Sequence, residues 1–195
     1  MKRTDRFLLQ LAGAPGTGKS GLARAIADVT GAVVLDADVV KSAILDSGVE
    51  WPAAGPAGYS VLFALAADLL DQGRSVIVDS PSHYATIPER GLAISGTYGV
   101  TYRFIECVCD DDDQLEQRMA GRAPRPSQMR GVGRAPLAST GAMSPNATQV
   151  GQHRWKTFGP ANGHLRLDTR GGRDSYVPAA LAYVAGEPHE ERGER

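Results

Sequence analysis

Cysteine is scarce in this chain, with only Cys107 and Cys109 among 195 residues. Two positions apart on a predicted strand, their side chains point to opposite faces, which does not suit a disulfide. The four histidines are scattered and supply no partners at ligand spacing for a C-x-C metal site. We therefore interpret both cysteines as small apolar strand residues in a reducing compartment.

Long apolar runs are missing too. No run approaches the roughly 18 residues of a membrane-spanning helix, so no membrane partner is expected. The apolar stretch in the first residues, MKRTDRFLLQLAG, is too short for a signal sequence and leads directly into a glycine-rich loop. We interpret it as a first strand, and we expect a cytoplasmic protein.

Acidic residues are absent from 117–167, which gives this stretch a strongly basic character. The net charge of the whole chain is −1, so the molecule as a whole is not expected to bind polyanions. Nucleic acid stays an alternative partner of the basic stretch but is not favoured, because its arginines lack interleaved aromatic residues. The basic residues are Arg118, Arg122, Arg125, Arg130, Arg134, Arg154, Lys156 and Arg166.

Short apolar runs alternate with segments of helical periodicity along the chain. This alternation predicts an α/β fold, in which a parallel sheet of five strands is covered on both faces. We expect one domain over 1–195, with a lid or substrate loop at about 118–155 and a flexible tail at 187–195, because 123–150 is rich in proline and glycine and lacks periodicity. The predicted strands are 7–11, 32–35, 75–78, 102–108 and 163–167, and the predicted helices are 19–29, 39–46, 59–70, 88–95, 114–119 and 176–184.

The segment from Gly13 to Ser20 fits the pattern G-x-x-x-x-G-K-[ST] at every fixed position. An apolar strand precedes it and a helix follows, which is the context that this phosphate-binding loop requires. Its glycines let backbone N–H groups turn toward phosphates, and the helix N-terminus adds a favourable dipole. The pattern predicts that Lys19 bridges the β- and γ-phosphates of ATP and that Ser20 ligates Mg²⁺. The expected nucleotide contacts are Gly13, Ala14, Pro15, Gly16, Thr17, Gly18, Lys19, Ser20 and Leu22.

Two further strand ends carry acidic residues. Asp79 ends the run SVIVD in the manner of a Walker B strand and is predicted to help hold the metal. Ser80 follows it where an ATPase motor normally has a carboxylate, which favours transfer over hydrolysis. Asp36 and Asp38 follow another strand, and the residues alone leave Asp38 equally suited to be a catalytic base or a helix N-cap.

The ordered set GxPGxGKS, D-x-x-K, VIVDS and R-x-x-x-R resembles the P-loop kinases that include polynucleotide kinase, zeta toxin and chloramphenicol phosphotransferase. The likeness is close from Phe7 to about Arg122 and loose beyond. It implies a P-loop NTPase sandwich with a lid, in which Asp38 is the base for the acceptor hydroxyl and Lys41 helps to hold the acceptor. Lys41 stands where the group usually has arginine, and the segment after Arg122 is longer than a minimal lid.

Arg118 and Arg122 are spaced i, i+4 and are expected to share one helix face. The resemblance places them at the lid, where arginines meet phosphates as charge develops during transfer. Asp79 and His83 are also expected near the acceptor, and Trp51, Tyr59 and Trp155 are candidates for an acceptor pocket.

The sequence thus predicts a kinase that uses Mg-ATP to phosphorylate a hydroxyl of a small molecule such as an antibiotic, nucleoside or nucleotide sugar. A 5′-hydroxyl polynucleotide kinase is the near alternative. A hydrolysing switch or motor and a non-catalytic ATP-binding protein are the more distant ones. No Asn-Lys-x-Asp motif of a GTPase is present.

Overall fold

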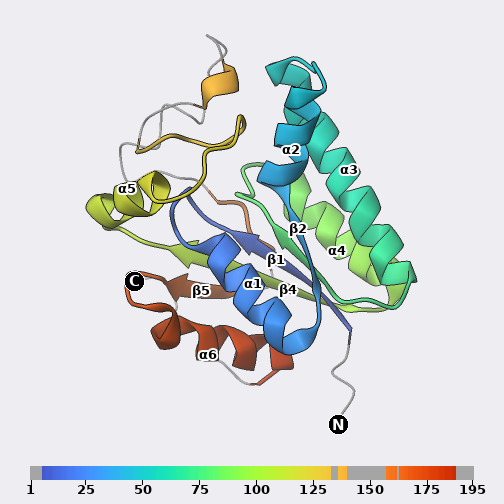
Figure 1. Ribbon diagram of the computed structural model, residues 1–195. Coiled ribbons are helices and arrows are strands. Elements are labelled where there is room, and N and C mark those ends of the chain that lie inside the picture. Colours follow the sequence, from blue (N-terminus) through green and yellow to red (C-terminus); the bar gives the residue numbers. More distant parts are fainter. Residues whose placement is uncertain (1–5, 133–135, 140–156, 162, 188–195) are drawn as a thin grey trace.

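A parallel sheet of five strands forms the centre of the computed structural model, in the order β2-β3-β1-β4-β5 (Figure 1). The structure describes residues 6–132, 136–139, 157–161 and 163–187. All six residues of β1 are buried, as expected for a central parallel strand flanked on both sides. The strands are β1 Phe7–Ala12, β2 Val33–Asp36, β3 Val76–Asp79, β4 Thr101–Val108 and β5 Leu165–Asp168.

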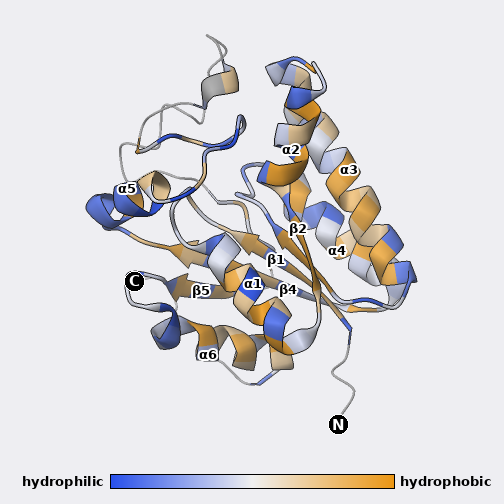
Figure 2. Cartoon of the chain, viewed as in Figure 1, coloured by the Kyte–Doolittle hydropathy of each residue, from blue (hydrophilic) through white to orange (hydrophobic). Residues whose placement is uncertain are grey.

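Helices cover both faces of this sheet, and alternate residues of β1 pack into separate cores. Phe7, Leu9 and Leu11 pack with the inner faces of α1 and α6, whereas Leu8 packs with α3. Figure 2 shows hydrophobic strands between these helices and a hydrophilic α5 outside the layers. The predicted three-layer α/β/α sandwich with five parallel strands is therefore confirmed. The helices are α1 Lys19–Thr30, α2 Ala37–Asp46, α3 Trp51–Asp71, α4 Thr86–Tyr98, α5 Asp112–Ala120 and α6 Arg173–Ala185.

The longest helix, α3, begins eight residues before its predicted start at Tyr59. Pro52 occupies the first turn, where its missing N–H removes no intrahelical hydrogen bond. Pro56 lies inside the helix and lacks the N–H that would continue the ladder. The two prolines and two glycines among the first eight residues of α3 interrupt the helical pattern in the sequence, although the packed structure tolerates them.

By length and composition alone, α3 contradicts the expectation that no segment could span a membrane. Its 21 residues include a window of mean hydropathy 1.4, enough for a span by that criterion alone. In the structure the helix packs against the sheet through Leu62, Ala66 and Leu70, which are fully buried. Its apolar character is thus used, at least in part, to build the core.

Other element boundaries differ from the predicted ones by a few residues, with one consequence for the site. Helix α5 ends at Ala120, so Arg122 lies beyond the helix and does not share a face with Arg118 as predicted. A short 3₁₀ turn, η1, spans Leu137–Ser139 within the predicted lid. Trp155 and much of the lid and tail lie outside the described residues, and their structure stays a prediction. Both cysteines are free, with Cys107 buried and Cys109 partly exposed.

Candidate nucleotide-binding and acceptor site

The loop after β1 folds as the sequence motif requires. Gly13 has a φ of 128°, and a Cβ on it would lie 2.1 Å from the carbonyl oxygen of Cys107. Gly18 caps α1 in a left-handed conformation, so the loop turns directly into the helix N-terminus. The Thr17 hydroxyl donates to Ala14 O at 2.8 Å, and the Thr169 hydroxyl donates to Thr17 O at 2.8 Å. The phosphate-binding loop is therefore bonded to the residue that follows β5.

Lys19 lies across the mouth of this loop. Its ammonium donates to the carbonyl oxygens of Gly13 at 2.9 Å and Ala14 at 2.8 Å. These contacts hold a positive charge beside the helix N-terminus, which already favours anions through its free N–H groups and its dipole. The arrangement fits the phosphate groups of a nucleotide, as the sequence predicted.

Arg118 on α5 and Arg122, just beyond the end of α5, both reach the cavity. Arg118 donates to Gly16 O at 3.4 Å and to Thr169 O at 2.6 Å, so it joins the phosphate loop to the end of β5. Arg122 donates to Met129 O at 2.7 Å and thereby holds the segment that follows α5. Both arginines line the cavity, although the single helix face predicted for them does not exist.

Asp79 lies at the end of β3, beside β1 in the register Leu11↔Asp79 and beside β2 in the register Asp36↔Asp79. It is 4% exposed, and its Oδ2 atom is buried without a hydrogen-bond partner. Burial raises the pKa of Asp79 to about 6, while Lys19 and a hydrogen bond from Ser20 act in the opposite direction. A buried, unpartnered carboxylate oxygen beside a serine hydroxyl is a suitable ligand for a divalent cation.

These donors fit Mg²⁺ held together with nucleotide phosphates. Within the described part of the chain, no three His, Cys, Asp or Glu side chains form a metal-binding group. Mg²⁺ commonly needs no such group, because it keeps several waters and binds through one or two carboxylates plus substrate phosphates. Ser20 and Asp79 would therefore suffice as protein ligands, and their role in metal binding stays a prediction.

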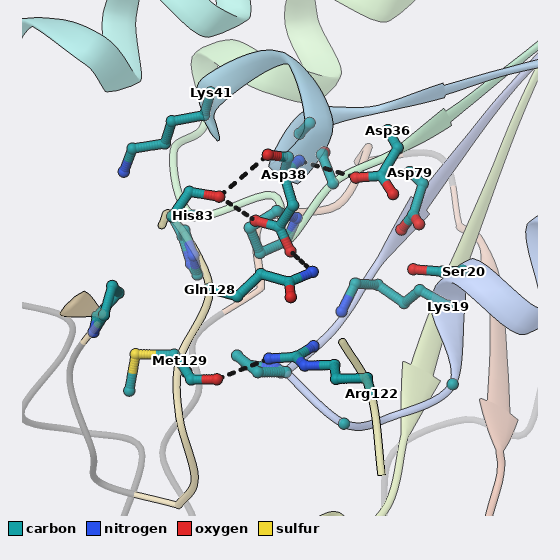
Figure 3. A pocket seen from close by; sticks show the side chains of 18 of the residues that line it. Lys19, Ser20, Asp36, Asp38, Lys41, Asp79, His83, Arg122, Gln128 and Met129 are labelled. Carbon is teal, nitrogen blue, oxygen red and sulfur yellow. Dashed lines mark hydrogen bonds between the residues drawn. The ribbon is translucent and has the colours of Figure 1, made fainter. Parts of the chain in front are cut away.

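Asp36, and not Asp38, caps helix α2. The Asp36 carboxylate accepts from the backbone N–H groups of Asp38 at 2.8 Å and Val39 at 3.3 Å. Asp38 is the second residue of the helix, and its side chain faces the cavity instead of the helix end (Figure 3). The N-cap interpretation of Asp38 is thus wrong, and its carboxylate is available for other contacts.

Those contacts come from the segment after α5, which sequence reasoning did not connect with Asp38. Gln128 Nε2 donates to Asp38 Oδ2 at 3.0 Å. Ser127 Oγ lies 3.1 Å from Asp38 O and 3.4 Å from Asp38 Oδ1. Ser127 Oγ also lies 2.9 Å from Ser42 Oγ, and both serines are buried. The segment is therefore fastened to α2 around the candidate base.

Lys41 follows Asp38 on α2 and lies over Trp51, with its Nζ 3.5 Å from the ring centroid. Burial lowers the pKa of Lys41, and the charge of Asp38 partly opposes that effect. His83 is also part of the cavity wall, and burial, aided by Lys19 and Lys41, lowers its pKa to about 3. His83 is consequently neutral at physiological pH.

The loop that carries His83 is held in a strained conformation. Ser82 is fully buried and has a φ of 51°, the one positive value among non-glycine residues in the described chain. Its hydroxyl donates to Phe158 O at 2.8 Å and accepts from Gln10 Nε2 at 3.4 Å. Such a conformation costs on the order of 1–3 kcal/mol and persists where neighbouring contacts fix it. These contacts fix the loop next to the cavity.

One cavity of about 720 Å³ joins the phosphate loop to Asp38, Lys41 and Asp79. Its size lies within the roughly 300–1,000 Å³ usual for ligand sites. Leu22 does not line it: the side chain is fully buried in the core, and its N–H bonds to Gly18 O. The prediction of Leu22 as a nucleotide contact is therefore not supported. The lining residues that the sequence prediction missed include Tyr84, Ser127, Gln128, Met129, Arg173 and Tyr176.

The glycine loop between a strand and a helix, the parallel sheet and the acidic strand ends define a P-loop nucleotide-binding domain. The chain belongs to the family described as AAA domain, whose model matches residues 8–140. A comparison with curated proteins finds no match.

Solved structures of kinases share the fold at low sequence identity. A provisionally assigned kinase from Chloroflexus aurantiacus is 23% identical, with a TM-score of 0.68, covering 94% of this chain and 96% of that one. The APS kinase of Mycobacterium tuberculosis, solved with AMPPNP and APS, is 19% identical at a TM-score of 0.62, covering 91% and 96%. A gluconokinase from Sinorhizobium meliloti 1021 is 17% identical at 0.55, covering 95% and 94%. These structures show that the chain has the fold of P-loop kinases, which is the fold that the resemblance implied.

Proposed function

We propose that this chain is an ATP-dependent phosphotransferase that moves the γ-phosphoryl group of Mg-ATP onto a hydroxyl of a small molecule. The observation that carries the proposal is the shared cavity. The phosphate loop with Lys19 and the carboxylate of Asp38, which come from the ends of different strands, face the same space (Figure 3). Donor and acceptor can therefore be held together in one cavity.

The donor side consists of groups that bind and orient phosphates. Backbone N–H groups of the loop and the Lys19 ammonium attract the negative charge of the phosphates. The Arg118 guanidinium holds the loop next to the end of β5. Ser20 and Asp79 would hold Mg²⁺, which when bound neutralises phosphate charge and favours displacement at phosphorus. Arg122 lies beside this region and is suited to meet the charge that develops in the transition state.

The acceptor side is organised around Asp38. Its Oδ2 accepts from Gln128, whereas the contact of its Oδ1 with Ser127 is long at 3.4 Å. Oδ1 is therefore the atom best placed to accept the hydroxyl proton of the acceptor. The acceptor oxygen would then form its bond to the γ-phosphorus as the bond to the β–γ bridging oxygen breaks, and ADP would leave with that electron pair.

Hydrolysis is less favoured because Ser80 follows Asp79 where a second carboxylate would polarise water. The kinase neighbours also support transfer to a molecule, since their names refer to phosphorylation of acceptors such as gluconate or APS. ATP as the donor suits the cytoplasmic location that we expect.

A transfer assay tests the proposal. The protein is incubated with γ-labelled ATP and Mg²⁺ and with panels of antibiotics, nucleosides, nucleotide sugars, sugars and 5′-hydroxyl oligonucleotides. Label should appear on a small alcohol, vanish with Lys19→Ala, and fall roughly 10²- to 10⁴-fold with Asp38→Asn while ATP affinity is kept. Release of inorganic phosphate without any labelled acceptor, or full transfer by Asp38→Asn, would rule out the proposed reaction.

A further inference from the structure

Aromatic side chains line the part of the cavity around Asp38 and Lys41, which we call the acceptor end. This acceptor end is formed by α2, the first turns of α3, residues 80–84 and residues 127–129 with Pro136. Trp51 and Tyr59 come from α3, His83 and Tyr84 from the loop after β3, and Met129 from the segment after α5. Three separate parts of the chain thus supply rings and a thioether to the lining of this cavity.

Prolines extend this apolar wall without adding hydrogen-bond donors. Pro52 and Pro56 belong to the first turns of α3, Pro81 belongs to the loop after β3, and Pro136 precedes η1. The loop is held by the buried contacts of Ser82, so His83 and Tyr84 are fixed to a rigid backbone. A wall of this kind loses little conformational entropy when a ligand binds, which favours recognition of a rigid, flat body.

Charged groups at this end are few. Among the described residues that line it, Lys41 is the one cation, and its ammonium is engaged with the Trp51 ring at 3.5 Å. His83 adds no positive charge at neutral pH. Recognition of a phosphate or sulfate on the acceptor normally uses arginine forks. Arg118 is bonded to the phosphate loop, and Arg122, which reaches the edge of the acceptor end, is already bonded to Met129 O.

We propose that the acceptor is an uncharged alcohol that carries an aromatic or heteroaromatic ring, with the ring against Trp51, Tyr59 and His83 and the hydroxyl at Asp38. This inference rests on the proposed phosphotransferase function and narrows its substrate class. Flat rings gain edge-to-face or offset stacking with such walls beyond simple burial. An open-chain polyol would gain no such stacking and would place part of its hydroxyls against the rings and prolines of this end.

Equilibrium binding to the protein loaded with AMPPNP and Mg²⁺ tests the substrate class without requiring turnover. The probes are 2-phenylethanol and its saturated analogue 2-cyclohexylethanol, which match in hydroxyl placement, together with tryptophol and with gluconate as a ring-free polyol. Calorimetry should show that 2-phenylethanol binds roughly two- to tenfold more tightly than the cyclohexyl compound, because one or two ring contacts are lost in the latter. Tryptophol should bind most tightly, and gluconate should not bind measurably.

Variants at Trp51 separate ring contacts from general packing. Trp51→Leu keeps an apolar side chain but removes the ring, and it should weaken tryptophol binding about tenfold. Trp51→Phe keeps a ring and should lose no more than about threefold. AMPPNP affinity should be the same in both variants and the parent, which shows that the nucleotide site and the fold are intact.

The outcomes distinguish this inference from the proposed function. Transfer of label to gluconate or another ring-free polyol, with aromatic alcohols inert, would overturn the aromatic class and leave the phosphotransferase intact. Equal affinities for 2-phenylethanol and 2-cyclohexylethanol, no binding of any probe, or binding confined to a 5′-hydroxyl oligonucleotide would overturn it as well. Tight binding of aromatic alcohols without transfer of label to any of them would support the pocket but contradict the proposed reaction.

Discussion

The side-chain amide of Gln128 donates a hydrogen bond of 3.0 Å to the Asp38 carboxylate, although 90 positions separate the two residues in the sequence (Figure 3). The acceptor-only carboxylate fixes the orientation of the amide, with its nitrogen toward Asp38. Gln128 Oε1 is then buried without a hydrogen-bond partner. A buried, unpartnered carbonyl oxygen costs about 1–3 kcal/mol, so this orientation is maintained against a local penalty.

Gln128→Ala is expected to lower kcat roughly ten- to a hundredfold with little change in the KM for ATP. The loss follows because the substitution removes a charge-assisted hydrogen bond that orients the base but no contact with the nucleotide. Steady-state kinetics with varied ATP and varied acceptor measures this split. Gln72→Ala is a matched control, since Gln72 donates to Asp68 in an equivalent Gln–Asp pair at the exposed end of α3. Equal effects of the two substitutions would show that Gln128 does not position the base.

Arg122→Ala should reduce kcat by about 10²- to 10³-fold and weaken ATP binding much less. Its guanidinium bonds to Met129 O in the structure and lies beside the phosphate region, so its main interaction with phosphate is expected in the transition state. ATP affinity by calorimetry and kcat by transfer assay give the comparison. Arg24→Ala, on the exposed face of α1, is the control and should leave both quantities unchanged. Equal losses in kcat and ATP affinity would make Arg122 a ground-state contact.

Asp79→Asn should stabilise the metal-free protein at neutral pH while abolishing stabilisation by Mg-nucleotide. Burial raises the folded-state pKa of Asp79 to about 6 from an ordinary 3.8. The folded state therefore holds a proton between these values that the unfolded state releases, and stability falls as the pH rises from about 4 to above 6. Above that range, burial of the charged Asp79 carboxylate lowers the free energy of unfolding by its full amount, on the order of 3 kcal/mol.

Thermal unfolding at several pH values, without metal, measures this effect. The advantage of Asp79→Asn over the parent should be largest above pH 7 and should disappear near pH 4. Asp68→Asn, at a surface position on α3, is a control that should show no such pH-dependent gain. A parent protein whose stability rises between pH 4 and 7, with no gain from Asp79→Asn at pH 7, would contradict the assignment of a buried, proton-holding carboxylate.

Gly13→Ala should destabilise the fold by more than ~2 kcal/mol and remove ATP binding. The new Cβ would lie 2.1 Å from the Cys107 carbonyl oxygen, and the φ of 128° is strained for any residue with a side chain. Gly96→Ala is the matched control, because an added Cβ inside α4 meets nothing within 4 Å. It should be neutral or stabilise by up to about 1 kcal/mol. Denaturant unfolding and nucleotide titration check both variants, and a stable, ATP-binding Gly13→Ala protein would refute this account of the loop.

The sequence by itself determined the phosphate loop and the alternation of strands and helices. Both depend on neighbouring residues: the fixed spacing from Gly13 to Ser20, and apolar periods of two and 3.6 that a single segment displays. The position of Asp79 at a strand end followed from the same local pattern. These local patterns can be recognised without knowing how the rest of the chain folds.

Tertiary structure alone decided which distant groups meet at the acceptor. It placed Asp36 as the helix cap and turned Asp38 to the cavity, brought Gln128 to that carboxylate, and moved Leu22 into the core. It also brought Trp51 and His83 to the same cavity. No local pattern encodes these contacts, because they depend on the order of strands in the sheet and on how the loops at its carboxyl edge pack together.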